Sequence, residues 1–367
     1  MHVDTQLEAA LRALDHWPRF RLRLFFEGIV VGILSGTVIS FFRWGLEMGT
    51  VWRQWIYANV LASGGVLLNL SWFGVLLAAA LLLWRLGIYE LNAGGSGIPQ
   101  VKGVILGAIR MRWLRILWVK LVGGIVGIGL GLSLGREGPS IQIGAVTAQG
   151  LSRALGRTRM EERYLITAGA SAGLAAAFNA PLAGVMFALE ELHRNFSGVV
   201  LAPSMAAALL ATMVSRYVFG RAPVFHFGML PPFPLRYMWL VVILGIIIGL
   251  AGVVFNKGLL NIHYFYDLPV FRNNYMRIAF ALCMAGILGY VFPEVLGGGN
   301  DLVNSLYTLP LSLKLFAGLL IGKFLFTLVS YGCGVPGGFF LPMLVLGALT
   351  GGITGIVFVH LGLISSY

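Results

Sequence analysis

Long apolar stretches recur along this chain and constrain its fold more than any other feature. A helix needs about 20 mainly apolar residues to cross a bilayer. Stretches of this kind lie near residues 24–42, 66–88, 199–219, 238–255, 278–292, 311–331 and 339–364. Only 11% of the residues are charged, whereas a soluble domain has roughly a quarter. The sequence therefore predicts an all-α integral membrane protein with many spans.

The basic residues account for the net charge of +12, but they do not form a continuous stripe for nucleic acid. They gather in short clusters between apolar spans, a distribution typical of cytoplasmic loops. Segment 1–23 is amphipathic and basic, and no small-residue cleavage site follows the first apolar stretch, so we expect a cytoplasmic N-terminus rather than a signal peptide. The clusters are Arg12, Arg19, Arg21 and Arg23; Lys102, Arg110, Arg112 and Arg115; and Arg153, Arg157, Arg159 and Arg163.

Several apolar segments are interrupted. A span that begins at Trp113 reaches a Gly/Pro-rich group at 135–139, and the next apolar piece, 140–151, is too short to cross a bilayer. Segment 164–192 is broken by Asn179-Ala180-Pro181, since proline disrupts a helix interior. These interruptions predict broken, re-entrant helices.

The breaks are spaced as an internal repeat. The group at 94–99 precedes 135–139 by nearly the same interval as 297–300 precedes 336–340. Such paired interruptions indicate a transporter built from inverted repeats, with its site near the midplane. We predict a first repeat over 24–220 and a second over 221–367.

Two other glycine patterns predict close helix packing. Glycines recur at every fourth position, which leaves one helix face smooth enough for a neighbouring helix. The two stripes are Gly123, Gly127, Gly131 and Gly135, and Gly347, Gly351 and Gly355.

The helix starts at the breaks suggest a ligand. Non-helical backbone at membrane depth occurs where it is buried in protein or lines a cavity. Helix N-termini present unpaired N–H groups with partial positive charge, which bind anions. Several such ends converging would hold an anion without the full charge of Lys or Arg.

Four motifs resemble those of the CLC family of chloride channels and chloride/proton exchangers. Residues 95–99 (Gly-Ser-Gly-Ile-Pro) and 135–139 (Gly-Arg-Glu-Gly-Pro) match at every position, and 338–342 (Gly-Phe-Phe-Leu-Pro) keeps its Gly, second Phe and Pro. Residues 175–184 also resemble the family. The anion-binding residues implied by the resemblance are Gly95, Ser96, Gly97, Ile98, Pro99, Gly135, Arg136, Gly138, Pro139, Gly338, Phe339, Phe340 and Pro342.

The resemblance also implies residue roles. Ser96 would donate its hydroxyl to a central halide, which the amides of Phe339 and Phe340 would also hold. The Glu137 carboxylate would gate the pathway by occupying an anion position when charged and leaving it when protonated. Glu191 would relay protons on the internal side, as in the exchanging members.

The resemblance thus implies chloride transport, with chloride/proton antiport gated by Glu137, by a homodimer in the plasma (bacterial inner) membrane. It implies neither enzyme activity nor a metal or cofactor. The passive voltage- or pH-gated chloride channel is the alternative. The residues leave other roles open: Ser96 as a helix cap, Glu137 as an ion-pair partner, and Glu191 as a solvated surface charge.

The chain departs from the family in two places. Gln100 and Lys102 stand where the exchangers often carry acidic residues, and Lys102 is expected to alter the proton entrance near Glu191. The chain also ends soon after Pro342, without the family's last helices, one of which brings a tyrosine to the ion. This predicts an incomplete second repeat, and a third alternative, a non-transporting fragment or subunit.

Other patterns carry no function. Residues 169–173 fit a nucleophile elbow and 332–337 a dinucleotide fingerprint, but neither has the βα context that gives these patterns meaning. Cys283 and Cys333 lie in apolar segments and are expected to be small buried hydrophobes.

Overall fold

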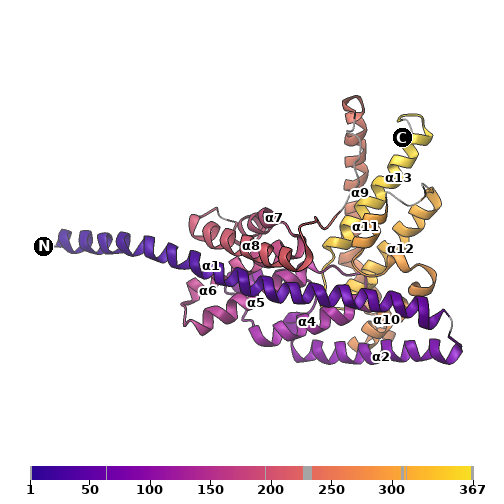
Figure 1. Cartoon of the computed structure of the whole chain (residues 1–367), viewed down its shortest axis with the longest axis horizontal. Helices are drawn as coiled ribbons and strands as arrows, with labels where there is room; N and C mark the ends of the chain where they lie inside the picture. The colour runs from indigo at the N-terminus through magenta and orange to yellow at the C-terminus, as the bar shows by residue number, and fades with distance from the viewer. Residues whose placement is uncertain are drawn as a thin grey trace. The chain divides into compact units, whose positions relative to one another are not determined.

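The computed structural model describes residues 2–62, 64–194, 196–225, 234–306, 310 and 312–364, and only the backbone of residues 2–19. Within these ranges the chain is almost entirely helical (Figure 1). The one β-type contact among the described residues is an isolated antiparallel bridge between Gly135 and Gly338. The predicted all-α fold is confirmed.

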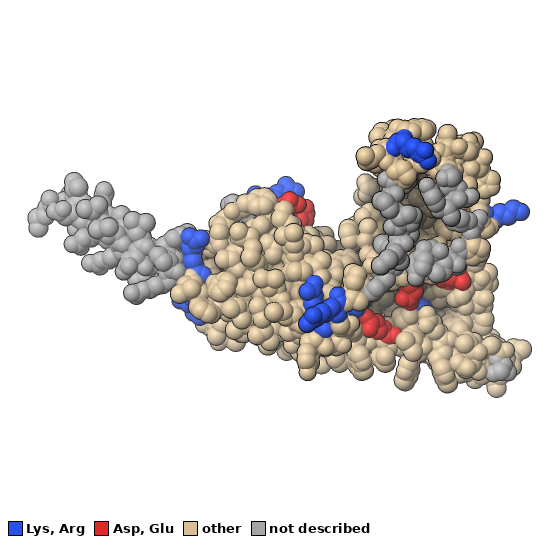
Figure 2. All heavy atoms as spheres, turned by 45° about the horizontal axis from the view of Figure 1, so that its top comes forward, with Lys and Arg blue, Asp and Glu red and all other residues tan. Residues whose placement is uncertain are grey.

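Seven helical stretches are long and apolar enough to cross a membrane, by length and composition. They are Phe20–Leu61, Val66–Tyr89, Gly198–Phe219, Leu235–Tyr266, Asn274–Val291, Leu313–Gly332 and Phe340–His360. Charged side chains are sparse on the face shown in Figure 2, and large apolar residues such as Leu67 and Val242 are exposed. Extended apolar surface of this kind fits contact with lipid.

The first span is longer than the sequence suggested. Helix α1 (His2–Trp55) runs without a break past the expected boundary at Arg23, and a π-helical segment, η1 (Ile56–Leu61), follows it. The charges within α1 have partners, because Arg23 pairs with Glu161 and Arg157 pairs with Glu27. The amphipathic character predicted for 1–23 rests largely on side chains outside the described residues.

The chain forms two compact units that interleave along the sequence. Unit 1 comprises 1–43, 97–121 and 139–222, and unit 2 comprises 44–96, 122–138 and 223–367. Helices α1, α4 (Trp113–Gly129) and α5 (Glu137–Ala154) pass from one unit to the other. These units differ from the division into 1–23, 24–220 and 221–367, which concerns sidedness and repeats and stays a prediction.

Unit 1 is built around α6 and α8. The elements that lie wholly within unit 1 are α3 (Ile98–Ile105), α6 (Arg159–Phe178), α7 (Pro181–Phe187), η3 (Ala188–His193) and α8 (Gly198–Phe219). Thr158 and Glu161 form a capping box at the start of α6, which satisfies backbone donors that a helix start leaves unpaired. Asn179 ends α6 in the left-handed conformation, with φ 60°. The predicted break at Asn179–Pro181 is confirmed.

Close approach of α1 to α8 depends on glycine. A Cβ at Gly28, Gly32 or Gly36 would lie 2.6–2.7 Å from backbone atoms of Pro203, Ala207 or Ala211. These glycines recur every fourth residue, so α1 has a small-residue face like those of other membrane helix pairs.

Unit 2 contains the remaining helices, of which α9, α12 and α13 pack against one another (Figure 1). Tyr57 from η1 donates to the Gly286 carbonyl (2.9 Å) and accepts from the Trp72 indole (3.1 Å), which ties α10 to η1 and α2. The elements wholly in unit 2 are η1, α2 (Val66–Tyr89), η2 (Leu91–Ala93), η4 (Leu235–Tyr237), α9 (Met238–Tyr266), η5 (Pro269–Phe271), α10 (Asn274–Val291), η6 (Pro293–Val295), α11 (Asn300–Ser305), α12 (Leu313–Gly332) and α13 (Phe340–His360).

The two predicted glycine stripes differ. Gly123 and Gly127 pack closely on Pro336 and Val335. By contrast, Gly347, Gly351 and Gly355 have no neighbour within 4 Å of a Cβ position among the described residues. For those residues, the predicted stripe makes no close helix contact.

We expect Gly32→Ala to lower the stability of the protein by about 1–3 kcal/mol, the usual cost of overpacking, because the new methyl meets the backbone of Ala207. The measurement is thermal or denaturant unfolding in detergent. Gly245→Ala in α9 is the matched control, since nothing lies within 4 Å of its Cβ position. Equal effects of the two substitutions would contradict the predicted close packing of α1 on α8.

Candidate functional site

Residues of the three Gly/Pro-rich breaks that belong to unit 2 contact one another through the backbone. Gly135 N–H donates to the Gly338 carbonyl (2.6 Å), and Gly338 N–H donates to the Gly135 carbonyl (2.8 Å). Gly337 N–H donates to the Gly95 carbonyl (3.0 Å). The backbone thus joins the residues just before α5 to those just before α13, and it joins the segment before α13 to the first motif.

Glu137 is the first residue of α5 and lies beside this pairing. Its side chain is buried, with a relative exposure of 2%. Neither carboxylate oxygen completes a hydrogen bond among the described residues, although the amides of Glu137 and Leu341 face the carboxylate. A Cβ at Gly135 would collide with this carboxylate, so Gly135 provides the space that the side chain occupies.

Ser96 lies against the start of α5. A Cβ at Gly138 would stand 2.7 Å from the Ser96 carbonyl oxygen and 2.8 Å from its Cβ. Ser96 is buried, and the cap residue of α3 is Gly97 with φ 88°, without a side-chain cap. Ser96 thus immediately precedes the cap position of α3.

Phe339 and Phe340 mark the start of α13. Phe339 is the cap residue, and its ring lies 5.1 Å from Tyr331 and 6.3 Å from Phe255, measured between ring centroids. The Phe340 side chain is exposed. Amides in a first helical turn point outward along the helix axis, so the start of α13 directs backbone donors toward the region of Glu137.

The prolines of the motifs sit where helices tolerate them. Pro99 is at the second position of α3 with Ile98 before it, and Pro139 and Pro342 lie in the first turns of α5 and α13. A proline there costs no intrahelical hydrogen bond. Arg136, also buried, lies 3.7 Å from Glu47 through Nη1 and Oε1.

A further break, at 297–299, also lies in unit 2, where a buried cation binds its backbone. Gly297 N–H donates to the Gly131 carbonyl (2.9 Å). Lys323 of α12 is fully buried and donates to the carbonyls of Val295 (2.9 Å) and Gly297 (2.6 Å). No sequence motif marks Lys323, although a lysine inside an apolar span is itself a signal of a special role.

Glu191 lies in unit 1, on η3. Its Oε1 accepts a hydrogen bond from the Lys102 Nζ at 2.7 Å, which confirms the expected proximity of Lys102. This hydrogen bond lowers the pKa of Glu191 below its usual range. Glu190, next to it, is exposed. Glu191 is thus an ion-paired carboxylate.

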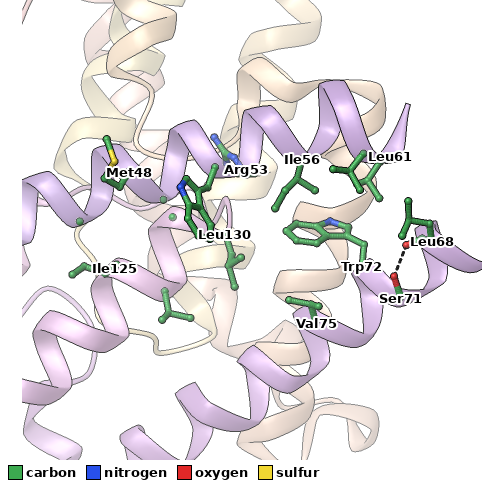
Figure 3. Close-up of a pocket in the computed structure, with 16 residues that line it drawn as sticks. Met48, Arg53, Ile56, Leu61, Leu68, Ser71, Trp72, Val75, Ile125 and Leu130 are labelled. Atoms are coloured by element: carbon green, nitrogen blue, oxygen red, sulfur yellow. Dashed lines mark hydrogen bonds between the residues drawn. The ribbon is translucent and has the colours of Figure 1, made fainter. Parts of the chain in front are cut away.

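A cavity of about 580 Å³ in unit 2 does not contain the motif residues (Figure 3). It lies among α1, η1, α2 and α4, and most of its labelled lining is apolar, including Ile56, Trp72 and Leu130. The lining also includes Arg53 and Ser71.

Comparison with known proteins covers nearly the whole chain. Residues 74–366 match the family model described as voltage-gated chloride channel. The H(+)/Cl(-) exchange transporter ClcA of Vibrio vulnificus (strain YJ016) is 33% identical over 341 residues, which cover 90% of this chain and 72% of the relative. ClcA of Salmonella agona (strain SL483) is 34% identical over 353 residues, with coverage of 93% and 73%.

Solved structures agree with this result. A slow cyanobacterial Cl−/H+ antiporter superposes with a TM-score of 0.85 and 31% identity, covering 92% of this chain and 80% of the other. A CLC-type fluoride/proton antiporter superposes with a TM-score of 0.73 over 93% of this chain and 82% of the other. Its 24% identity supports likeness of fold alone.

We expect Lys323→Met to lower the stability of the protein by about 2–4 kcal/mol, because two buried carbonyls lose hydrogen bonds to a charged donor. Unfolding of the purified protein in detergent measures the effect. Lys257→Met is the control, since Lys257 is exposed. If Lys323→Met proves as stable as the control, Lys323 does not hold the break at 297–299.

Proposed function

Because the chain belongs to the voltage-gated chloride channel (CLC) family, we propose that it exchanges chloride for protons across a membrane, with Glu137 as the gate. The relatives at 33–34% identity are named H(+)/Cl(-) exchange transporters, and the structure at 31% identity is a Cl−/H+ antiporter. The observation that carries the proposal is the buried Glu137 carboxylate beside the paired starts of α5 and α13.

The proposed gate follows from the chemistry of helix starts. Backbone N–H groups at the N-termini of helices stabilise anions, and a carboxylate placed there competes with chloride for the same donors. When Glu137 is charged it occupies the anion position. When it takes up a proton, its attraction to those donors weakens, and a chloride ion can replace it.

Chloride would lie near Ser96 and the amides of Phe339 and Phe340. The other motif residues supply the backbone conformations that bring these groups together: two paired glycines, Gly135 and Gly338, and the left-handed glycines Gly95 and Gly97. A site made of backbone donors binds the ion strongly enough for entry yet releases it, as conduction requires.

The charge distribution and the relatives indicate where in the cell the protein would act. The basic clusters between spans favour a cytoplasmic N-terminus by the positive-inside rule. The bacterial relatives favour the bacterial inner membrane, and a homodimer of lipid-embedded subunits is the proposed assembly. The motifs point to no metal or cofactor, and the proposed activity is transport rather than catalysis.

We predict that Glu137→Gln abolishes proton movement while chloride still flows, because glutamine cannot take up and release the proton. The measurement uses purified protein in vesicles, with chloride and proton electrodes read together. Glu294→Gln is the control at an exposed carboxylate of the same unit. Undiminished proton movement in Glu137→Gln would contradict the proposed gate.

We also predict that Glu191→Val removes proton movement and spares chloride, since only the internal proton site is lost. The same vesicle assay tests this, with Glu190→Gln as the adjacent control. If the unsubstituted protein never moves protons uphill against a chloride gradient, the passive-channel alternative holds instead.

A further inference from the structure

The ion pair between Lys102 and Glu191 is a feature of this chain that the proposed roles leave unexplained. The two side chains come from different elements of unit 1, α3 and η3, and their terminal atoms are 2.7 Å apart. The relative exposures of the side chains are 27% for Lys102 and 48% for Glu191. Both side chains of the pair are therefore partly exposed.

Few other charges face Glu191. Its own element and the cap that follows carry Glu190, His193 and Arg194. The first half of α8 contains no charged or titratable residue, and the nearest ring of α6, Tyr164, stacks on His193 at 5.8 Å.

The first turn of α6 carries charges of both signs, and two of them already have partners. Glu161 pairs with Arg23, and Glu162 lies 3.5 Å from Arg153. The remaining charges of that turn are Arg159 and Arg163. Among the described residues, Lys102 is thus the charge that contacts Glu191 directly, and Arg194 adds a smaller electrostatic attraction.

We propose that the Lys102–Glu191 ion pair controls proton entry on the internal side by holding Glu191 in its charged form until a proton from water displaces the ammonium. This inference rests on the proposed proton-relay role of Glu191. Lys102 acts as a positioning residue, because it binds Glu191 and not the transported ions.

Counting protons shows whether Lys102 only regulates protonation of Glu191 or passes the proton on itself. When a hydronium ion gives its proton to the Glu191 carboxylate, Lys102 keeps its three N–H bonds, and the net charge of the pair rises from zero to +1. Transfer of the lysine proton itself would need to overcome a difference of about six pH units between the ordinary pKa values of a lysine and a glutamate side chain. Lys102 therefore does not relay the proton.

The expected effect of Lys102 on the pKa of Glu191 is modest. A solvent-exposed ion pair contributes little, because water screens the charges and both side chains lose freedom. The direct contact nevertheless lowers the pKa of Glu191, so removing the ammonium raises it and allows protons to load at higher internal pH. Proton transport should then persist to a pH roughly 0.2–0.7 units higher, the range of a typical exposed pair.

The test compares Lys102→Gln, which removes the charge, with Lys102→Arg, which keeps it. Vesicles of the full chain are assayed for proton and chloride movement over a series of internal pH values, and the proton-to-chloride ratio is plotted against pH. We expect the midpoint of Lys102→Gln to move to higher pH and that of Lys102→Arg to stay with the unsubstituted protein. Chloride movement is the internal reference.

A second measurement keeps the outcome independent of transport. Carboxyl titration by isotope-edited infrared spectroscopy, with Glu191→Gln to identify the band, follows protonation of Glu191 directly. An unshifted Glu191 titration in Lys102→Gln, or the same shift in both lysine variants, would overturn the inference. If no proton moves in the unsubstituted protein, the proposed function fails, and the infrared titration still decides whether Lys102 controls Glu191.

Discussion

The pairing of Gly135 with Gly338 is the interaction on which the candidate site depends. Two reciprocal backbone hydrogen bonds, of 2.6 and 2.8 Å, join the segments that lead into α5 and α13. Buried backbone donors and acceptors must find partners, and here two interrupted segments satisfy each other. The helix starts that follow are thereby fixed in one place with their amides directed at a shared region. A side chain at Gly135 would occupy the space in which the Glu137 carboxylate lies, so the glycine leaves room for the carboxylate beside the pairing.

One buried cation near this site holds the backbone. Lys323 donates to two carbonyls beside the break at 297–299, whereas Arg136 lies near the carboxylate of Glu47. The Lys323 ammonium thereby stabilises the irregular backbone of that break. In the anion site proposed above, backbone amides would be the donors, and their partial charges would allow an ion to leave again.

Much of this arrangement was predictable from local sequence. Apolar length predicted most spans, and Asn179-Ala180-Pro181 predicted the end of α6, because these features act within a few residues. The extension of α1 to Trp55 was not predictable in the same way. Its charged residues Arg23 and Glu27 resemble a helix boundary, and they are accommodated by Glu161 and Arg157, which are distant in sequence. The same is true of the site. The motifs predicted which residues form it, but the carbonyl to which each amide donates depends on long-range pairings such as Gly337 with Gly95. Packing partners are set by the three-dimensional arrangement of the helices, so spacing alone did not separate a glycine stripe with a neighbour from one without.

The two glutamates to which we assign roles in transport lie in different surroundings, and these surroundings suit each to a different role. Glu137 is 2% exposed, and its carboxylate lies in the space beside two glycines, Gly135 and Gly338. Glu191 has an exposed side chain whose closest constraint is the charge of Lys102. Changes around Glu137 are therefore expected to act through shape, by blocking or freeing the anion position. Changes around Glu191 act through electrostatics, which alter how readily a proton binds without altering the space available to chloride.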